Sequence, residues 1–392
     1  MADYRFGIPD FQYVATGAAV LGSGGGGSYT DAVNVIEELS RRKWQGSVQV
    51  KDYDGSTNCC VLAMMGSPSV AERLTLADVE HSIVNTLGAF EKTTGTTLGC
   101  IIPGEIGSIN SLVPLIAAAT VDKVIWVVNG DGAGRAVPEL PQTTYSGGAL
   151  LAVSPCILAN NAKTAPTLQS SLLNAATAAQ IETLAGGIVT AFGSFSGIAL
   201  WPSNSANDYA LAGNYITGTL TQAWALGKFL SRASTPPSTA EVALQITSIT
   251  GRTATATLRN FYITAVTQST TSASLDAGII RLDNNPDQEK STETHHIYNL
   301  NESLVMYSSL SNVPDIIAPD SICYYSESTG FGFSNAKNDL ALYFDSGRST
   351  GRAVSIIKVE AASKLCNAAG VMASFAGLLR NIGYAGALPY PV

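Results

Sequence analysis

The sequence predicts an α/β protein with an N-terminal, mostly parallel sheet covered by helices on both faces, followed by a C-terminal antiparallel, barrel-like β domain. Up to about residue 230, short apolar runs of strand length alternate with segments whose apolar residues have helical spacing. Beyond residue 238 the apolar residues recur with a period of two, which is typical of antiparallel strands. Pro236 and Pro237 separate the two patterns, so we expect domains at 1–235 and 236–360.

The predicted first domain follows a repeated strand-helix order. Strands are predicted at residues 60–65, 98–103, 124–128 and 150–158, and helices at 11–21, 33–39, 76–92, 111–119, 175–191 and 218–230. Strands that alternate with helices are usually parallel neighbours, because the helix carries the chain back to the start of the next strand.

The predicted second domain is built from short strands between turn residues. Its runs lie at residues 242–249, 254–258, 261–264, 278–282 and 303–307. The stretch from 361 to 380 returns to helical composition. We therefore expect the tail, residues 361–392, to pack back on the first domain.

The composition excludes some classes of function. A net charge of −8 and a pI near 4.9 argue against nucleic acid as a partner, because neutralising phosphates needs clustered Lys and Arg. No apolar run has the length of a membrane span, and the first residues show no secretory signal. The six cysteines lack metal-type spacing. We expect a cytoplasmic protein with reduced core cysteines.

A glycine-rich segment, residues 22–28, separates the first two predicted helices. Gly24, Gly25 and Gly26 together with Ser28 predict a nest of backbone N–H groups that binds a substrate anion or a developing negative charge. The segment lacks the Gly-Lys-Ser/Thr of a phosphate-binding loop, and a helix rather than a strand precedes it, so no nucleotide is expected. The alternative is a close-packed turn between helices.

Polar residues also follow two of the predicted strands. Glu105 and Asn110 come after the strand at 98–103. The strand at 124–128 is followed by four more polar residues, namely Asn129, Asp131, Arg135 and Glu139. The carboxyl ends of parallel strands are where ligands bind, so we expect these loops and the glycine segment to face one crevice.

Each of these residue types suggests a role in that crevice. Glu105, Asp131 and Glu139 are the candidate catalytic residues, since paired carboxylates can act as acid and base. Asn110 and Asn129 are expected to contact substrate, and Arg135 to hold a substrate carboxylate. The alternative is that Arg135 pairs with Glu139 or Asp131 and stabilises the loop.

The metal-ligating residue types give no clear metal site. His295 and His296 are adjacent in a strand-like context, so their side chains point to opposite faces and cannot easily bind one ion. One of the two could still reach the crevice. Cys100 is a weak candidate nucleophile because it precedes the strand end. The sequence does not identify a cofactor, and it is compatible with a divalent metal ion.

Several motifs occur in an order that resembles the S-methyl-thiohydantoin desulfurase family, which is associated with hydantoinase and oxoprolinase proteins. They lie at residues 21–27, 65–70, 105–110, 130–139, 301–302, 314–317 and 383–392. The resemblance covers nearly the whole chain and implies an N-terminal α/β domain and a C-terminal β-barrel-like domain. The family usually has Asp where Asn129 stands, and Asn cannot act as a base.

The resemblance implies a hydrolase that acts on a small cyclic amide such as an S-methyl-thiohydantoin or a hydantoin-like ring and releases a thiol. Glu105 or Asp131 would activate a water, and the glycine segment would stabilise the ring charge. The alternatives are a non-catalytic metabolite-binding subunit, which the Asn at 129 favours, and a partner of a hydantoinase/oxoprolinase-type complex. A homo-oligomer is also compatible with the sequence.

Overall fold

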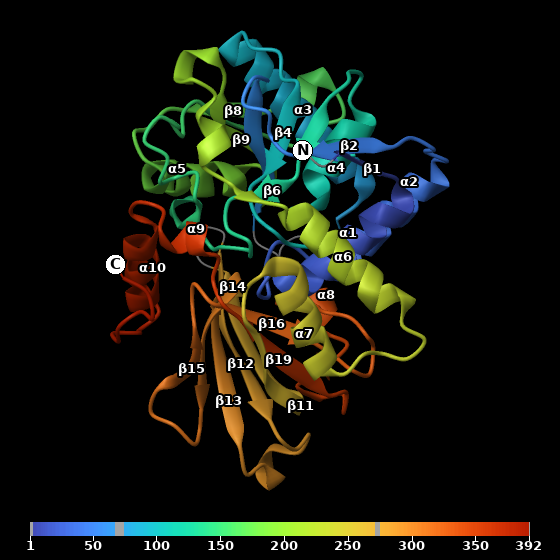
Figure 1. Ribbon diagram of the computed structural model, residues 1–392, viewed down its shortest axis with the longest axis vertical. Helices are drawn as coiled ribbons and strands as arrows, with labels where there is room; N and C mark the ends of the chain where they lie inside the picture. Colours follow the sequence, from blue (N-terminus) through green and yellow to red (C-terminus); the bar gives the residue numbers. More distant parts are fainter. Residues whose placement is uncertain (1–2, 67–73, 271–274, 392) are drawn as a thin grey trace.

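A computed structural model describes residues 3–66, 74–270 and 275–391 of the chain. An α/β unit lies at the top of Figure 1 and a curved β-sheet at the bottom. The mixed α/β class predicted from the sequence is confirmed. Residues 67–70 of the motif at 65–70, and the last residue of the closing motif, lie outside the described residues.

The N-terminal sheet has eight strands in the order β1-β2-β5-β4-β3-β9-β7-β8. The pairs β2–β5, β5–β4 and β4–β3 are parallel, and the remaining pairs are antiparallel. The strands are β1 Asp3–Phe6, β2 Val48–Lys51, β3 Cys59–Gly66, β4 Cys100–Pro103, β5 Trp126–Val128, β7 Cys156–Ala159, β8 Ser170–Leu173 and β9 Phe195–Ser203.

The prediction of a mostly parallel sheet is therefore not confirmed. Parallel pairing is limited to the centre, where the strand-helix repeat is regular. The sequence prediction missed β9, which runs antiparallel to both β3 and β7, and it missed the hairpin of β7 and β8. A buried strand has the same apolar composition whether its neighbours are parallel or antiparallel, so composition alone could not settle the direction.

Helices cover both faces of this sheet, as predicted. They are α1 Ile8–Leu21, α2 Tyr29–Arg41, α3 Leu76–Thr94, α4 Leu112–Thr120, α5 Ala178–Ala191 and α6 Thr219–Arg232. Alternate residues of β3 divide the core in two. Cys60 and Leu62 belong to the apolar cluster shared with α1 to α4 and α6, whereas Cys59 and Val61 belong to the cluster shared with α5.

The C-terminal sheet has seven strands, all paired antiparallel, in the order β15-β14-β13-β12-β11-β19-β16. Its edge strands β15 and β16 are not paired with each other, so the sheet is an open half-barrel rather than a closed barrel. The strands are β11 Ala254–Thr270, β12 Asp276–Asp283, β13 Thr294–Leu300, β14 Glu302–Ser308, β15 Pro314–Ile317, β16 Ser321–Tyr325 and β19 Val354–Val359.

Short elements connect and extend the two sheets. They are β6 Gly130–Asp131, β10 Ile216–Thr217, α8 Lys337–Leu340, β17 Phe344–Asp345, β18 Arg348–Ser349, and the 3₁₀ turns Leu140–Gln142, Ala165–Thr167, Ser205–Asn207, Ala210–Gly213 and Gln288–Lys290. The pairing of β6 with β10 places Asp131 opposite Ile216 and so joins two loops near the strand tips.

The prediction of a strand at residues 242–249 is wrong. It is part of helix α7, Thr239–Thr250. Its apolar residues also fit helical spacing, since Val242 and Ile246 are four residues apart and buried, whereas Leu244 is 71% exposed. Ser238 and Glu241 form a capping box at the start of α7, and this local signal outweighs the short alternation.

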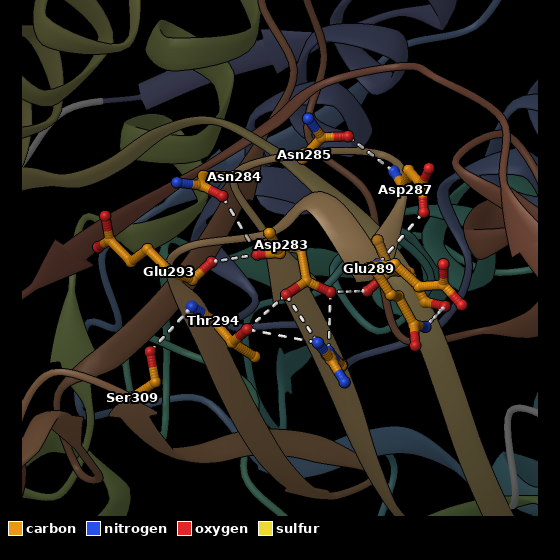
Figure 2. Close-up of polar contacts among 12 residues, drawn as sticks. Asp283, Asn284, Asn285, Asp287, Glu289, Glu293, Thr294 and Ser309 are labelled. Atoms are coloured by element: carbon orange, nitrogen blue, oxygen red, sulfur yellow. Dashed lines mark hydrogen bonds and ion pairs between the residues drawn. The ribbon is translucent and has the colours of Figure 1, made fainter.

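The far end of the C-terminal sheet is a polar hairpin between β12 and β13 (Figure 2). The buried carboxylate of Asp283 accepts hydrogen bonds from the Arg281 guanidinium at 2.7 and 3.0 Å and from the Thr294 hydroxyl at 2.5 Å. Burial raises the pKa of Asp283, but these hydrogen bonds lower it by more, so the net shift is downward. The network is therefore satisfied by its own side chains and lies away from the contact with the N-terminal sheet.

The chain ends with α9 Ser363–Cys366 and α10 Val371–Asn381. In Figure 1 α10 lies beside the join between the two sheets. It contributes Val371, Phe375 and Leu379 to an apolar cluster that also contains Val137 and Leu304. The tail thus packs against both halves of the molecule. Among the described residues, no helix combines the length and apolarity that a bilayer crossing requires.

Helices α1 and α6 touch backbone to backbone through two glycines. A Cβ atom at Gly17 would lie 1.9 Å from the carbonyl oxygen of Ala223, and one at Gly227 would lie 1.8 Å from that of Tyr13. Neither position can accept a side chain without separating the helices, since the neighbouring atoms are backbone.

We predict that Gly17→Ala lowers the free energy of unfolding by at least about 2 kcal/mol, because overpacking outweighs the gain in helix propensity. Gly187→Ala is the matched control, since a Cβ atom at that exposed position of α5 meets nothing within 4 Å. The control should gain up to about 1 kcal/mol. Urea denaturation of both variants measures the difference, and equal stabilities would show that the two helices can separate freely.

Candidate functional site

A cavity of about 160 Å³ lies where the strand tips of the N-terminal sheet meet the start of β14. Part of its wall is apolar and includes Val61, Ala63, Phe195, Ile198, Leu200 and Trp201. The polar part includes Ser28, Glu105, Asn110, Glu139, Glu182 and Glu302. Engineered apolar cavities of roughly 150 Å³ hold benzene, so this volume suits a ligand with one small ring.

The glycine loop, residues 22–27, joins α1 to α2 and reaches between the two halves of the molecule. Gly24, Gly26 and Gly27 have φ values of +82°, +69° and +92°. A Cβ atom at Gly26 would lie 2.3 Å from the Cα atom of Gly107, so the loop packs directly on the 105–110 segment. The carbonyl oxygen of Gly26 accepts the amides of Ile109 and Asn110 at 3.0 and 3.1 Å.

The loop is a close-packed turn, which was the alternative considered for it. Gly26 and Gly27 at its end, and Ser28 directly after it, line the cavity. Ser28 caps α2 by accepting the amide of Asp31, and its hydroxyl donates to Asp339 at 2.9 Å. The predicted contacts Gly24 and Gly25 do not line the cavity, because they face the C-terminal sheet instead.

Glu105 follows β4 and places its carboxyl group in the cavity wall. Its Oε1 accepts the Asn110 side-chain amide at 2.7 Å, and its Oε2 accepts the backbone amide of Val137 at 2.7 Å. Burial raises the pKa of Glu105 to about 7, although these two hydrogen bonds oppose the rise. A carboxyl group in this state can exchange a proton near neutral pH.

Asn110 orients Glu105 and closes the loop. Its side-chain oxygen accepts the backbone amide of Met64 at 3.0 Å while its NH₂ donates to Glu105. Both ends of the amide are therefore fixed, and Asn110 joins β3 to the segment after β4. Asn110, predicted from the sequence to contact substrate, lies in the cavity wall.

Three further acidic residues of the wall, Asp31, Glu182 and Glu302, were missed by the sequence prediction. Glu302 opens β14 and is 3% exposed. Glu182 lies in α5, accepts the Leu140 amide at 2.9 Å, and has its pKa raised to about 8, mainly by burial and further by Glu139 and Glu105. Glu302 belongs to the family motif at 301–302, so the sequence held a signal for it. Glu182 is a single Glu in a predicted helix, and nothing in the sequence marks it as a site residue.

Glu139 also lines the cavity and faces the C-terminal helix. Its Oε2 accepts the side-chain amide of Gln142 at 3.1 Å, and the same NH₂ group donates to Ser374 of α10 at 2.7 Å. The wall thus includes part of the loop that α10 packs against.

The predicted site residues Asp131 and Arg135 do not line the cavity. Asp131 is fully buried, and its carboxylate accepts the backbone amides of Ala133 and Gly134 at 2.9–3.0 Å. Burial raises its pKa to about 6, although these hydrogen bonds act to lower it. These hydrogen bonds close the turn that follows β6, so the geometry gives Asp131 a loop-forming role.

Arg135 joins the N-terminal loop to the C-terminal sheet. Its guanidinium donates to the carbonyl oxygens of Ala136, Pro319, Asp320 and Ser303 at 2.8, 3.1, 2.8 and 2.9 Å. It is fully buried, and burial lowers its pKa to about 10. Neither of the partners predicted for it, Asp131 or Glu139, forms an ion pair with it among the described residues. Its hydrogen bonds are committed to backbone, which leaves little capacity for a substrate carboxylate.

No histidine of the described residues lines the cavity. His295 is buried on β13, where its ring nitrogens face Asp315 and Glu293 at 3.0 and 2.9 Å and its ring contacts Phe261 edge-on. Neither His295 nor His296 lines the cavity. In the part of the chain that the structure describes, no three His, Cys, Asp or Glu side chains are grouped closely enough to hold a metal ion. Five of the six cysteines are buried and all six are free thiols, as expected for core residues.

Comparisons with known proteins identify the family. The description "S-Me-THD-like, N-terminal domain" matches residues 9–170, and "S-Me-THD-like, C-terminal domain" matches residues 176–372. The chain belongs to the S-Me-THD-like family. A crystal structure of a protein from Chromobacterium violaceum shares the fold, with a TM-score of 0.79 and 23% identity over 99% of each chain. No curated protein matches the chain.

The side chain of Asn129, where the resemblance led us to expect Asp, has a structural role. Asn129 does not line the cavity. Its side-chain oxygen accepts the amide and hydroxyl of Thr221 at 3.1 and 3.2 Å, in the first turn of α6. An Asp oxygen would serve equally well there, since helix N-termini favour carboxylates. The side chain of Asn129 is therefore committed to the first turn of α6.

We predict that Arg135→Met lowers the free energy of unfolding by about 3–5 kcal/mol, because it leaves several buried carbonyl oxygens without donors. Arg348→Met is the control, since Arg348 is exposed on β18. Chemical denaturation measures both. If Arg135→Met were as stable as the control and lost only ligand binding, the sequence prediction of a substrate-binding arginine would be correct instead.

Proposed function

We propose that the protein hydrolyses a small cyclic amide-like ring, with S-methyl-thiohydantoin as the model substrate, and releases a thiol. The observation that carries this proposal is Glu105, a carboxyl group in the wall of a one-ring cavity whose pKa of about 7 lets it accept a proton at neutral pH. The family description points to the thiohydantoin class of ring.

The reaction requires one water and no net change in oxidation state. The oxygen of water adds to the ring carbon that bears the S-methyl group, and the Glu105 carboxylate takes a proton from that water. The carbon–sulfur bond then breaks, and methanethiolate leaves and is protonated to methanethiol. The ring carbon becomes a carbonyl group, so the product is a hydantoin-type ring.

The cavity wall supports this chemistry in two ways. Val61, Leu200 and Trp201 exclude water from one side of the bound ring, which strengthens the interactions of the Glu105 carboxylate. Asn110 and the Val137 amide hold both oxygens of Glu105 in place, so its position does not depend on the ligand. A base held in this way loses little entropy when the reaction begins.

We predict that kcat/KM for S-methyl-thiohydantoin rises with pH to a plateau above about pH 7, since only the ionised Glu105 can accept a proton. The same raised pKa has the opposite effect on stability. Between the ordinary pKa of 4.5 and about 7 the unfolded chain releases the proton that the folded protein keeps, so the contribution of Glu105 to stability falls as pH rises.

Glu105→Gln should lower kcat by a factor of about 10²–10⁴. It should also cost roughly 1 kcal/mol of stability, because one N–H of the glutamine amide then faces another donor. Glu289→Gln, on the exposed hairpin, is the control and should match the wild type. Methanethiol release is measured with a thiol reagent. Tight binding of the ring without any turnover by the wild type would favour a non-catalytic metabolite-binding subunit or a partner of a hydantoinase/oxoprolinase-type complex.

A further inference from the structure

Glu302 is the most unusual polar residue of the cavity. Its side chain lines the cavity, yet the residue is only 3% exposed. Its Oε2 is buried and has no hydrogen-bond partner among the described residues. Leaving a buried carboxyl oxygen without a partner is costly, so such groups usually have a function or a ligand.

The carboxyl group of Glu302 is held in place by the glycine loop. A Cβ atom at Gly25 would lie only 2.0 Å from its Oε1, so a side chain at this position would displace the carboxyl group. The amide of Gly26 faces the same carboxyl group and favours its charged form. The backbone on either side is fixed as well, since the Ser303 amide donates to the Ser23 carbonyl oxygen at 2.9 Å.

No cation neutralises this carboxyl group directly. Arg135 acts on it electrostatically, but its hydrogen bonds go to backbone carbonyl oxygens, and it forms no ion pair with Glu302 among the described residues. Burial raises the pKa of Glu302 well above its ordinary value, Glu105 raises it further, and Arg135 only partly opposes the rise. The un-ionised acid has a proton to donate, and Oε2 is the oxygen that lacks a partner.

The charge of the whole lining agrees with this state. Five acidic residues line the cavity, namely Asp31, Glu105, Glu139, Glu182 and Glu302, and no Lys, Arg or His among the described residues does. An anionic group on the ligand would enter without a cationic partner and beside carboxylates, which is unfavourable in a partly dry site.

We propose that Glu302 is an un-ionised carboxylic acid whose Oε2–H donates a hydrogen bond to a carbonyl, thiocarbonyl or nitrogen acceptor of the bound ring, and that the site therefore takes uncharged rings and rejects rings that carry a carboxylate. The proposal deepens the proposed function, because it concerns the ligand of the same cavity. It does not require that the ring be hydrolysed.

Two variants separate the hydrogen bond from the shape of the side chain. Glu302→Gln keeps an N–H donor with nearly the same shape, whereas Glu302→Met has a similar length and no donor. Calorimetric titration with hydantoin should give Kd values within about threefold of the wild type for Glu302→Gln and at least about tenfold weaker for Glu302→Met, since one hydrogen bond contributes roughly 1.4 kcal/mol. Thermal unfolding identifies the folded variants.

The ligand pair hydantoin and hydantoin-5-acetic acid tests the charge rule on the wild type. The anionic ring should bind at least about tenfold more weakly than the neutral ring. Equal binding of the two rings, or a folded Glu302→Met variant that binds hydantoin as the wild type does, would overturn the proposal.

Infrared difference spectra keep this test independent of the proposed function. The spectrum of the wild type minus that of Glu302→Gln should contain the carbonyl stretch of an un-ionised carboxylic acid at neutral pH. If that band is present while neither ring binds, the proposed thiohydantoin function fails and the donor state of Glu302 stands. A carboxylate band in its place would overturn the inference whichever rings bind.

Discussion

Ser23 in the glycine loop makes the contact on which the rest of the site depends. Its carbonyl oxygen accepts the Ser303 amide at 2.9 Å, and its hydroxyl accepts the Ile322 amide at 2.9 Å. These bonds connect the end of the first helix to residues of the C-terminal sheet that lie 280 and 299 positions further along the chain. Ser23 itself has a φ of +51°, a conformation that a serine adopts only when its surroundings require it. The glycine loop therefore joins the N-terminal half of the molecule to the C-terminal sheet through these hydrogen bonds.

The positions of Glu105 and Glu302 follow from the packing of the glycine loop. The loop packs against Gly107, two residues after Glu105, and against Glu302 at the start of β14, and both glutamates line the cavity. Both carboxyl groups are desolvated because the backbones around them are in contact, and desolvation is the largest cause of the raised pKa of each. Arg135 strengthens the same connection, because it donates to the backbone carbonyl oxygens of Asp320 and Ser303.

The sequence predicted the elements better than their arrangement. Strands that end in glycine and a polar residue, as at Glu105, were recognisable because burial and turn formation act over a few residues. The direction of β9, the helix α7 and the burial of Asp131 and Arg135 were not, because they depend on neighbours distant in sequence. A charged residue in a glycine-rich loop has the same local pattern whether it faces a ligand or a carbonyl oxygen. Glu302 stood in a family motif, but only the tertiary fold, which brings β14 to the glycine loop, shows that it lines the cavity.

A crystal structure of the protein with bound hydantoin tests the central claim most directly, namely that the glycine loop brings two carboxyl groups together around one small uncharged ring. The account predicts the ring in the cavity between the sheets, with Oε2 of Glu302 and an oxygen of Glu105 each within hydrogen-bond distance of a ring atom. A ring bound elsewhere on the protein, with the cavity filled by water or by side chains, would contradict it.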